Sequence, residues 1–419
     1  MTPTAEYPSA QIVKDYQIHK CELVNVAGKT IDVRYQMVQI NVFEDIENAT
    51  ISGTLLVNDA LNQIMNLPIV CFDTCNISFS SINKPRWTIS FEIYKISEVQ
   101  WLRDQQQVYM LHLVAREQIT DAKTRVSKSY KGYLISDIVT DLQENWLDSS
   151  FNNIETTKYL QHIIIPNFHP MQAINWMATR ANSATYNGAS YLYYQDRDGF
   201  NFITAESLLA GPTVNTYHIQ PGSVRKDTPE GYKPPRVNAE MKSLEVWRTS
   251  QYSDALDNMH SGMYGNEVYI HDLAKKSWAV STFSYPDSFS EYKHLTPNPL
   301  WSTTRPDGRN AAAKRKFHSA GQSPFPFNPD SWLGVRISQL QQLHNVTFEV
   351  MIPGDTSKKV GQVLEIVLPS PEPLINDQQV LDKYYRGRYL ISTVKHTVIE
   401  KSFTTTLTLV KDSVFSPWP

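Results

Sequence analysis

The sequence predicts an α+β protein that is mainly β, with two duplicated antiparallel β-barrels, a small inserted α/β domain and a long irregular excursion. Apolar residues alternate with a period of two from residue 31 to about residue 117, which is typical of half-buried strands. Helical spacing of apolar residues replaces this alternation after Ser129. Two segments near opposite ends of the chain resemble each other, which indicates that the β unit is duplicated.

The first barrel is predicted over residues 31–125, after an N-terminal arm of residues 1–30. Turn-forming residues separate its alternating segments, among them Asn48 and Gly53. The alternating positions include Val38, Ile40 and Val42, then Trp87, Ile89, Phe91 and Ile93, then Tyr109, Leu111 and Leu113. This pattern favours a compact antiparallel sheet or barrel.

An inserted α/β domain is predicted over residues 126–215. Two helical stripes indicate its helices, one with Leu134, Ile135, Ile138, Val139 and Leu142, the other with Ala173, Ile174, Met177, Ala178 and Ala181. Pro170 suits the first turn of the second helix. The segment Asp196-Arg-Asp-Gly199 lies between two strand-like runs and predicts a hairpin turn.

The rest of the chain predicts the second barrel and its interruption. Residues 216–239, rich in Pro, Gly, Lys and Arg, indicate a linker or a strand that returns to the first barrel. The second barrel begins over 240–280 and resumes over 346–412, before a C-terminal tail of residues 413–419. Between its parts lies the irregular or helical excursion, residues 281–345, with a short helix expected at 310–317. Long excursions of this kind are usually binding loops or subunit contacts.

The duplication rests on two matched pairs of segments. Tyr94, Ile96, Ser97 and Val99 match Tyr389, Ile391, Ser392 and Val394, while Leu111, Leu113 and Val114 match Leu407, Leu409 and Val410. Tyr94 precedes Leu111 by 17 positions, and Tyr389 precedes Leu407 by 18. Such residues are common in strands, so a short match can be accidental. The agreement in order and spacing favours two copies of one barrel.

Composition and motifs give no support for catalytic, cofactor or metal sites. The formal net charge is -3, which provides no strong attraction to nucleic acid or anionic membranes. Cys71 and Cys75 lack a second Cys/His pair for zinc, and Cys21 is the only other cysteine. Nucleotide-binding glycine loops and local hydrolase motifs are also missing from the sequence. We expect no secretory signal or membrane anchor, and folding in a reducing cytoplasm.

The order of several segments resembles the baseplate hub proteins of contractile-tailed bacteriophages, whose relatives include the hub portion of type VI secretion spike proteins. The resemblance covers roughly residues 35–412. The matching segments are Val38-Gln-Ile-Asn-Val-Phe-Glu-Asp45, Ile51-Ser-Gly-Thr-Leu-Leu-Val57, Leu67-Pro68, Tyr130-Lys-Gly132, Ile165-Pro-Asn167, Pro170-Met-Gln-Ala-Ile-Asn-Trp176, Asp198-Gly199-Phe200-Asn-Phe202, Val350 to Gly354, Gly361 and Gly387-Arg-Tyr-Leu-Ile391. Residues 284–330 match no motif of the family.

This resemblance implies two tail-tube-like barrels in each chain and a homotrimer that forms a pseudo-sixfold ring. Such a ring would act as a symmetry adaptor in the virion tail baseplate, assembled in the host bacterial cytoplasm. The implied partners are a spike protein on one side and a tail tube or tube-initiator protein on the other, with contacts to baseplate wedge proteins also compatible. DNA would be only passing cargo in the central channel.

Two other functional classes remain open from the sequence. A carbohydrate-binding or adhesion β module would use exposed aromatic platforms such as Tyr292, Trp301 or Phe325. A cell-wall hydrolase would need two carboxylates that converge in a cleft. The candidate carboxylates are Glu44, Asp45, Glu92, Asp196 and Asp198.

Overall fold

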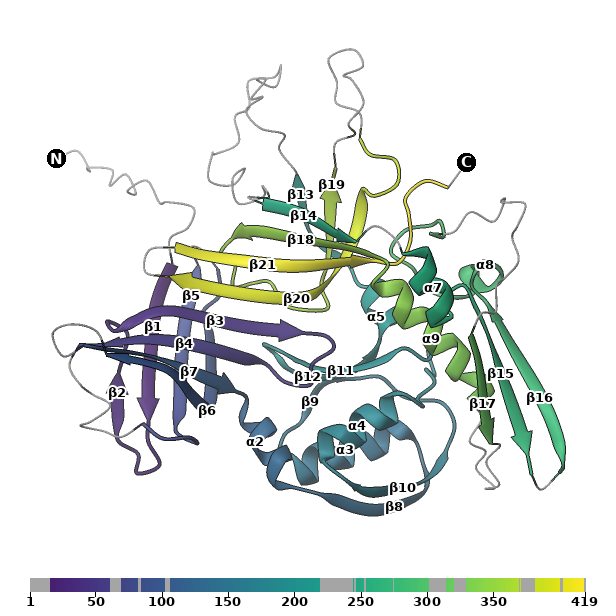
Figure 1. Ribbon diagram of the computed structural model, residues 1–419, viewed down its shortest axis with the longest axis horizontal. Coiled ribbons are helices and arrows are strands. Elements are labelled where there is room, and N and C mark those ends of the chain that lie inside the picture. Colours follow the sequence, from purple (N-terminus) through teal and green to yellow (C-terminus); the bar gives the residue numbers. More distant parts are fainter. Residues whose placement is uncertain are drawn as a thin grey trace, which may run out of the picture.

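The computed structural model describes residues 16–60, 69–81, 84–101, 106–218, 244, 246–251, 254–273, 275–300, 314–319, 329–368, 370, 381–399 and 402–417. Its described strands form one 13-stranded sheet, one 2-stranded sheet and two 3-stranded sheets. Figure 1 shows the large sheet with the α/β unit on one side of it and the β15–β16–β17 sheet at the end away from β1–β7. The mainly β, α+β class predicted from the sequence is confirmed.

The first part of the large sheet, which we call lobe 1, contains the N-terminal strands. They are β1 (Tyr16–Val24), β2 (Thr30–Asp32), β3 (Met37–Asp45), β4 (Ser52–Asp59), β5 (Thr74–Ser81), β6 (Trp87–Trp101) and β7 (Gln107–Val114). Inward and outward positions alternate along these strands, as in β4, where Leu55 and Val57 are fully buried. This period of two places the apolar residues of each strand on one face of the sheet, where they form one core.

The second part of the large sheet, lobe 2, gathers strands from the later half of the chain. They are β13 (Thr213–His218), β14 (Val246–Gln251), β18 (Val346–Pro353), β19 (Val363–Val367), β20 (Gly387–Ile399) and β21 (Ser402–Lys411). These strands enclose a second core. The strand order β3-β4-β7-β6-β5-β1 in lobe 1 corresponds to β14-β18-β21-β20-β19-β13 in lobe 2. The end pairs differ, since β1 runs antiparallel to β5 whereas β13 runs parallel to β19.

The two lobes are joined edge to edge. Residues Gln39–Asp45 of β3 pair antiparallel with Thr393–Ile399 of β20. Two separate barrels were predicted, but no closed barrel is found among the described strands. Ile40 and Val398 are buried where β3 and β20 pair. The apolar layer therefore continues from one lobe to the other, and the two lobes belong to one open sheet.

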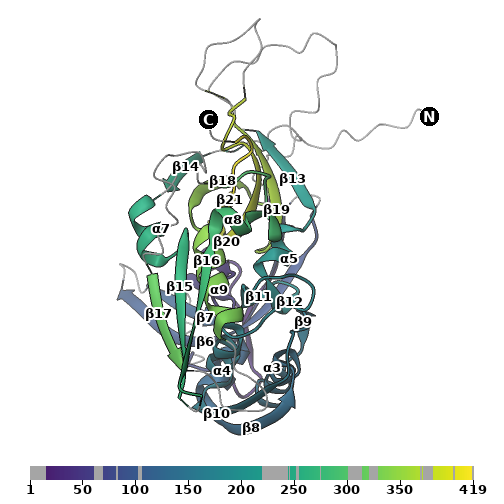
Figure 2. The ribbon, with the colours of Figure 1, turned by 90° about the vertical axis from the view of Figure 1, so that its right-hand side faces the viewer.

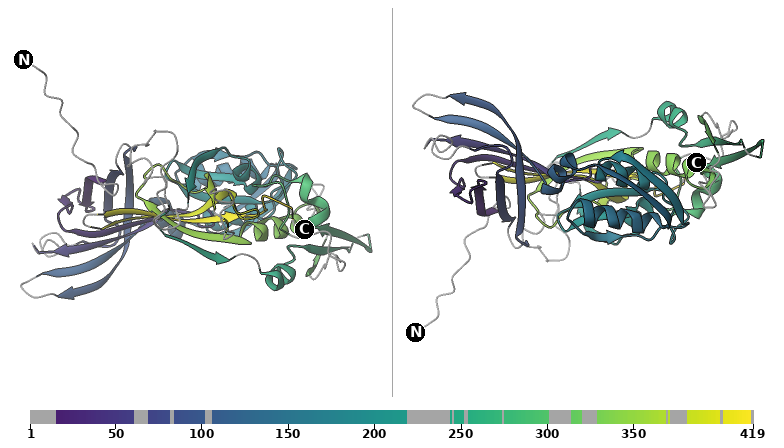
Figure 3. Two further views of the ribbon diagram at one scale, coloured as in Figure 1. Left: turned by 90° about the horizontal axis from the view of Figure 1, so that it is seen from above. Right: turned by 90° about the horizontal axis from the view of Figure 1, so that it is seen from below.

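The α/β unit follows lobe 1 in sequence and has its own core. It contains α2 (Arg116–Lys123), β8 (Val126–Tyr133), α3 (Ile135–Trp146), β9 (Phe151–Ile154), β10 (Gln161–Phe168), α4 (Pro170–Ala178), β11 (Tyr191–Asp196), β12 (Gly199–Thr204) and α5 (Ala205–Leu209). The apolar stripe of α3 is buried at Ile135, Ile138 and Leu142, as its spacing predicts. Pro170 occupies the first turn of α4, where a missing N–H does no harm. Figure 3 shows this unit beside the long sheet when the molecule is viewed from below.

The remaining elements form a distal unit. They are α7 (Ala255–Ser261), β15 (Gly265–Asp272), β16 (Ser277–Ser284), α8 (Tyr285–Ser288), the 3-10 helix η2 (Phe289–Glu291), β17 (Lys314–Ser319), the 3-10 helix η3 (Pro329–Ser331) and α9 (Leu333–Leu343). Strands β16, β15 and β17 make a separate sheet, which lies in front in Figure 2.

Several predicted boundaries differ from the structure. Residues 16–24, assigned to an arm, form β1, because Cys21 and Leu23 point into the core of lobe 1. Residues 216–218 are the described part of the segment expected to be a linker or a strand returning to the first barrel, and they instead belong to β13 of lobe 2, which pairs with β19; residues 219–243 lie outside the described residues.

Two further corrections concern the distal unit. Residues 265–280 do not begin the second barrel, since β15 and β16 pair with each other. The helix expected at 310–317 is wrong for its described part, because Lys314–Ser319 pairs with β15 as strand β17.

Candidate functional site

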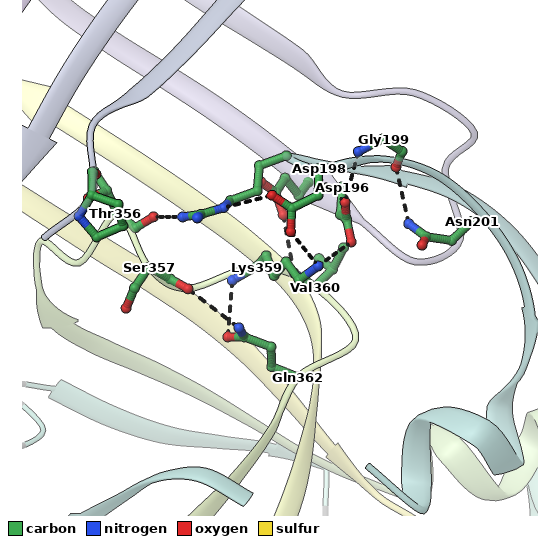
Figure 4. Close-up of polar contacts among 12 residues, drawn as sticks. Asp196, Asp198, Gly199, Asn201, Thr356, Ser357, Lys359, Val360 and Gln362 are labelled. Carbon is green, nitrogen blue, oxygen red and sulfur yellow. Dashed lines mark hydrogen bonds and ion pairs between the residues drawn. The ribbon is translucent and has the colours of Figure 1, made fainter. Parts of the chain in front are cut away.

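The loop between β18 and β19, residues 354–362, contacts both lobe 1 and the α/β unit, and we call it the junction loop. It begins with a close approach of two backbones, since the N–H of Gly354 donates to the carbonyl of Phe403 at 2.9 Å. A Cβ atom at Gly354 would lie 2.1 Å from the Phe403 ring, so only glycine fits there. Figure 4 shows the loop beside the turn between β11 and β12.

Ion pairs join the junction loop to the α/β unit. Lys359 Nζ lies 2.9 Å from Asp196 Oδ2 and 2.7 Å from Asp198 Oδ2, and Figure 4 shows it between the two carboxylates. Asp196 also accepts the backbone N–H groups of Asp198 and Gly199 at 2.8 and 3.1 Å. Arg197 donates to the carbonyl oxygen of Thr356. The hairpin turn predicted from Asp196-Arg-Asp-Gly199 is therefore also a docking element.

The same loop is held against lobe 1. The N–H of Thr356 donates to Ser81 Oγ at 3.2 Å, and its hydroxyl donates to the carbonyl of Pro85 at 2.9 Å. Lys84 Nζ lies 3.2 Å from Asp355 Oδ2. Because these contacts come from the end of β5 and the segment after it, the junction loop connects lobe 2 to both other units.

Glu44 of β3 is one of the buried acids of this junction. Its Oε2 accepts the N–H of Val360 at 3.1 Å, while Oε1 has no hydrogen-bond partner among the described residues. Burial raises the pKa of Glu44 to about 8, since an ionised carboxylate loses its hydration there. The group is therefore predominantly protonated at pH 7.

A cleft of about 600 Å³ opens between lobe 1 and the α/β unit. Its lining includes Trp87, Glu92, Arg116, Arg197 and Asp198. The carboxylate of Glu92 lies 4.0 Å from Arg116 Nε. Asp198 of this lining also pairs with Lys359 of the junction loop at 2.7 Å.

The carboxylates proposed for hydrolysis are held by structural contacts. Asp45 accepts the N–H of Glu47 at 2.9 Å and the side-chain amide of Asn48 at 2.6 Å, as expected for a turn. Asp196 and Asp198 share Lys359. Catalytic carboxylates in glycosidases flank the bond that they cleave. The carboxylates of Asp196 and Asp198 instead face Lys359.

The predicted repeat residues lie in two hairpins that occupy corresponding places in the lobes, β6–β7 and β20–β21. All seven residues on β20 and β21 are buried, as are the three on β7. On β6, however, Tyr94 is 48% exposed and Val99 is 51% exposed. These two are not core residues, because in the described structure the second half of β6 is flanked only by β7.

The β-bulges of the two hairpins indicate a residue correspondence that differs from the one predicted from the sequence. The register shifts after Ile93 in β6 and after Ile391 in β20, and these residues pair with Leu113 and Leu409. Leu113 and Leu409 occupy corresponding places in the two hairpins. On the neighbouring strand, Ile93 rather than Ile96 occupies the place of Ile391.

Other candidate residues give no site. Tyr292 packs near Phe283, with ring centroids 6.3 Å apart, and burial raises its pKa to about 12; Trp301 and Phe325 lie outside the described residues. Cys71 is an exposed free thiol and Cys75 a buried one. Within the described ranges, no group of three His, Cys, Asp or Glu side chains is arranged for a metal. None of the described helices is long and apolar enough to cross a membrane.

Sequence reasoning singled out the Asp196 turn but missed Lys359 as its partner. The two residues are far apart in the sequence, so no local spacing connects them. Glu44 carried a usable signal, since it continues the inward positions of Ile40 and Val42 along β3. An acid at such a position predicts a buried carboxyl with a raised pKa.

Comparison with known proteins supports the resemblance inferred from the segment order. A probable baseplate hub protein of Vibrio phage KVP40 is 21% identical over 430 residues, covering 97% of this chain and 97% of the phage protein. No family model matches the chain. The similarity to the Vibrio phage protein confirms the resemblance to baseplate hub proteins over nearly the whole length of this chain.

Solved structures of two tail proteins share this fold. A tail protein from Neisseria meningitidis MC58 aligns with a TM-score of 0.55 and 11% identity, covering 96% of this chain and 98% of that chain. The 43 kDa tail protein of prophage MuSo2 from Shewanella oneidensis aligns with a TM-score of 0.55 and 9% identity, covering 94% and 98%. The arrangement of lobes and α/β unit is therefore a tail-protein fold.

Proposed function

We propose that this chain is the non-enzymatic structural hub of a contractile phage-tail baseplate. Three copies form a ring of six lobes that joins the central spike to the tail tube and surrounds the DNA channel. The end-to-end similarity to a probable baseplate hub protein carries this proposal. The corresponding strand orders of the two lobes support it further.

We infer that the two lobes are copies of one structural unit. Strands in corresponding places pair in the same order, and the bulge after Ile93 recurs after Ile391. A threefold ring of two-lobed chains would present six similar lobes. Such a ring can match a threefold spike on one side and a sixfold tube on the other, which is the role of a symmetry adaptor.

The contacts of the junction loop suit a structural part whose units must stay together. Lys359, Thr356 and Glu44 connect both lobes and the α/β unit through hydrogen bonds and ion pairs that are mostly shielded from water. Partly buried charge pairs resist screening by salt better than exposed ones. The formal charge of -3 also suits a conduit, because a strongly basic chain would retain DNA through many phosphate contacts.

The partners belong to the same proposal. They are a spike protein and a tail tube or tube-initiator protein, with baseplate wedge proteins on the outside and DNA only as passing cargo. The chain would fold in the host cytoplasm and become part of the virion tail.

Oligomeric mass and particle shape test this function. The full chain is purified alone and after co-expression with the neighbouring tail proteins, then measured by light scattering and negative-stain imaging. A trimer with an open centre, alone or with a spike partner, is expected. A chain that stays monomeric and joins no tail protein would overturn the proposal.

A further inference from the structure

Residues 292–298 run along the end of the chain, and we call this segment the strap. The N–H of Asn298 donates to the carbonyl of Val414 at 3.2 Å, and the N–H of Val414 donates to the carbonyl of Asn298 at 2.8 Å. The N–H of Thr296 donates to Ser413 Oγ at 2.8 Å. The strap follows η2 in the sequence, so it joins the α8–η2 end of the distal unit to the residues that follow β21 of lobe 2.

His294 lies in the strap with an oxygen atom at each of its ring nitrogens. Its Nδ1 lies 2.6 Å from Asp412 Oδ2, and its Nε2 lies 2.9 Å from the carbonyl oxygen of Phe289. Asp412 also accepts the N–H of Leu295 at 3.2 Å. The Phe289 ring stacks on the imidazole, with centroids 3.8 Å apart and planes 5° apart. One side chain therefore links the strap, η2 and the end of the chain.

The two contacts of His294 together require more hydrogens than a neutral ring carries. A carbonyl oxygen and an ionised carboxylate only accept hydrogen bonds, whereas a neutral imidazole has a single N–H. Burial alone would raise the pKa of Asp412, but the charge of His294 and several hydrogen bonds hold this pKa below its ordinary value. With Asp412 ionised, only the imidazolium has a donor for both Asp412 and Phe289.

The charged groups around His294 come from α5, the strap and the end of the chain. Glu206 of α5 is 2% exposed and accepts the N–H of Lys293 at 3.2 Å; the Lys293 side chain itself is exposed. Lys411 lies next to Asp412, but its Nζ donates to the carbonyl of Arg386 at 2.7 Å. Burial opposes the charge on His294, yet Asp412, the Phe289 carbonyl and Glu206 raise its pKa above the ordinary value of 6.5.

We propose that the proton on His294 fastens the strap to the end of lobe 2 and that its loss releases the strap. Without this proton, one ring nitrogen faces an oxygen at hydrogen-bond distance with no hydrogen between them, in a site where the His294 side chain is 9% exposed. An unsatisfied buried polar contact of this kind is costly. All of these contacts lie within one chain, so they do not depend on the proposed ring.

The direction of the pH effect follows from the two groups of the pair. Because the pKa of His294 is raised in the folded chain, its contribution is complete below the ordinary histidine pKa and is lost as the pH rises through the raised value. In acid the contribution is lost as Asp412 becomes protonated, below its lowered pKa. The strap should therefore be closed near neutral pH and open in mild alkali.

The α9 side of the distal unit is fixed independently of His294. Arg336 Nη1 donates to the carbonyls of Ala178, Ala189 and Tyr191 at 3.0, 3.0 and 2.9 Å. A guanidinium keeps its charge across the neutral range, so α9 stays on the α/β unit when the strap opens. Release should therefore loosen only the α8–η2 end of the distal unit.

Amide hydrogen exchange of the full chain, followed by mass spectrometry, tests this proposal. Protection factors are compared, because they cancel the intrinsic dependence of exchange on pH. Fragments that contain residues 292–299 and 412–416 report the strap, and fragments that contain 402–408 report β21. Strap protection should fall at least about tenfold between about pH 6 and about pH 9, whereas β21 protection should stay within about twofold.

Two glutamine variants assign the effect. His294→Gln cannot titrate, so its strap should be poorly protected at both pH values and change by less than about twofold. His344→Gln is the matched control, since His344 pairs with Glu47 at 2.8 Å instead of with the end of the chain. It should keep the pH dependence of the native strap.

Two results would overturn the proposal. One is strap protection in the native chain that stays the same at the two pH values, which decides the matter even if His294→Gln does not fold. The other is a fall that persists in His294→Gln, which would assign the pH dependence to Lys411, whose pKa is lowered by burial to about 7.

Discussion

The two lobes have corresponding strand orders, but their hairpin ends differ in surroundings. The β20–β21 end of lobe 2 inserts Phe403 into the core of lobe 1, where its ring centroid lies 5.5 Å from that of Phe79. The β6–β7 end of lobe 1 leaves Trp101 66% exposed. Both ends are built from similar strands, so the difference comes from the partner. The β20–β21 hairpin meets lobe 1 within the chain, whereas the second half of β6 pairs only with β7 among the described strands.

Removing the Phe403 ring should have the largest effect. Phe403→Ala should lower the free energy of unfolding by about 4 kcal/mol, because it leaves a cavity in a core shared by both lobes. Trp101→Ala, its matched control at the other hairpin end, should change that free energy by less than about 0.5 kcal/mol in the isolated chain. Urea unfolding followed by tryptophan fluorescence and circular dichroism measures both.

The two variants differ in the exposure of the ring that is removed, since Phe403 is fully buried and Trp101 is largely exposed. Equal losses of stability in the two isolated variants would contradict the difference drawn between the hairpin ends.

The junction loop is a second difference between the lobes, because it is a loop of lobe 2 that forms ion pairs with the α/β unit. Lys359→Ala should lower the free energy of unfolding by roughly 3 kcal/mol, because Asp196 is 3% exposed and would lose its charge partner. The exposed pair Lys20–Glu22, with N···O 2.8 Å, provides the control. Lys20→Ala should cost less than about 0.5 kcal/mol. Similar costs for the two lysines in thermal and urea unfolding would show that burial does not distinguish these pairs.

Glu44 should make the stability of the lobe joint depend on pH. Burial raises the pKa of Glu44 from 4.5 to about 8, so the folded chain binds this proton more tightly than the unfolded chain does. The contribution of Glu44 to stability is greatest below about pH 4.5 and falls as the pH rises towards 8. Glu44→Gln should remove this dependence and stabilise the chain at pH 8 by on the order of 3 kcal/mol relative to the native residue.

Glu47 supplies a control of opposite sign near the same strand. Its hydrogen bond with His344, 2.8 Å long, holds the pKa of Glu47 below its ordinary value. This ion pair stabilises the chain only where Glu47 is ionised and His344 is protonated. Its contribution is lost as the pH falls through the pKa of Glu47, and also as the pH rises through the pKa of His344, which the same pair raises above its ordinary value. In acid, Glu47→Gln should therefore reduce the fall of the unfolding midpoint with falling pH, whereas Glu44→Gln should leave that fall unchanged; an acid limb that both variants leave unchanged would contradict these assignments.

The sequence predicts strands and faces well because both depend on a local period. The alternation in β3 and β7 places Ile40 and Leu111 inside, as observed. Which edges join is a long-range matter, since β3 and β20 are separated by most of the chain. Alternation alone could not decide between two closed barrels and one open sheet. The match predicted between the Tyr94 and Tyr389 segments differs from the structural correspondence for a related reason. A β-bulge changes the strand register without a local signal in the sequence.

The junction could be predicted only in its local parts. Asp196-Arg-Asp-Gly199 carries the chemistry of a turn, and the structure has a two-strand hairpin there. The ion pairs of Lys359 depend on how lobe 2 packs against the α/β unit, which no spacing in the sequence encodes. Glu44 is intermediate, since alternation predicts its inward direction but not the Val360 N–H that it accepts.

The symmetry of the assembled particle tests the central claim most directly. Image averages of the full chain, co-expressed with the spike and tube proteins, measure the number of chains and the arrangement of lobes around the axis. We predict three chains and six similar lobes around an open centre. A particle with another number of chains or a closed centre would contradict this prediction.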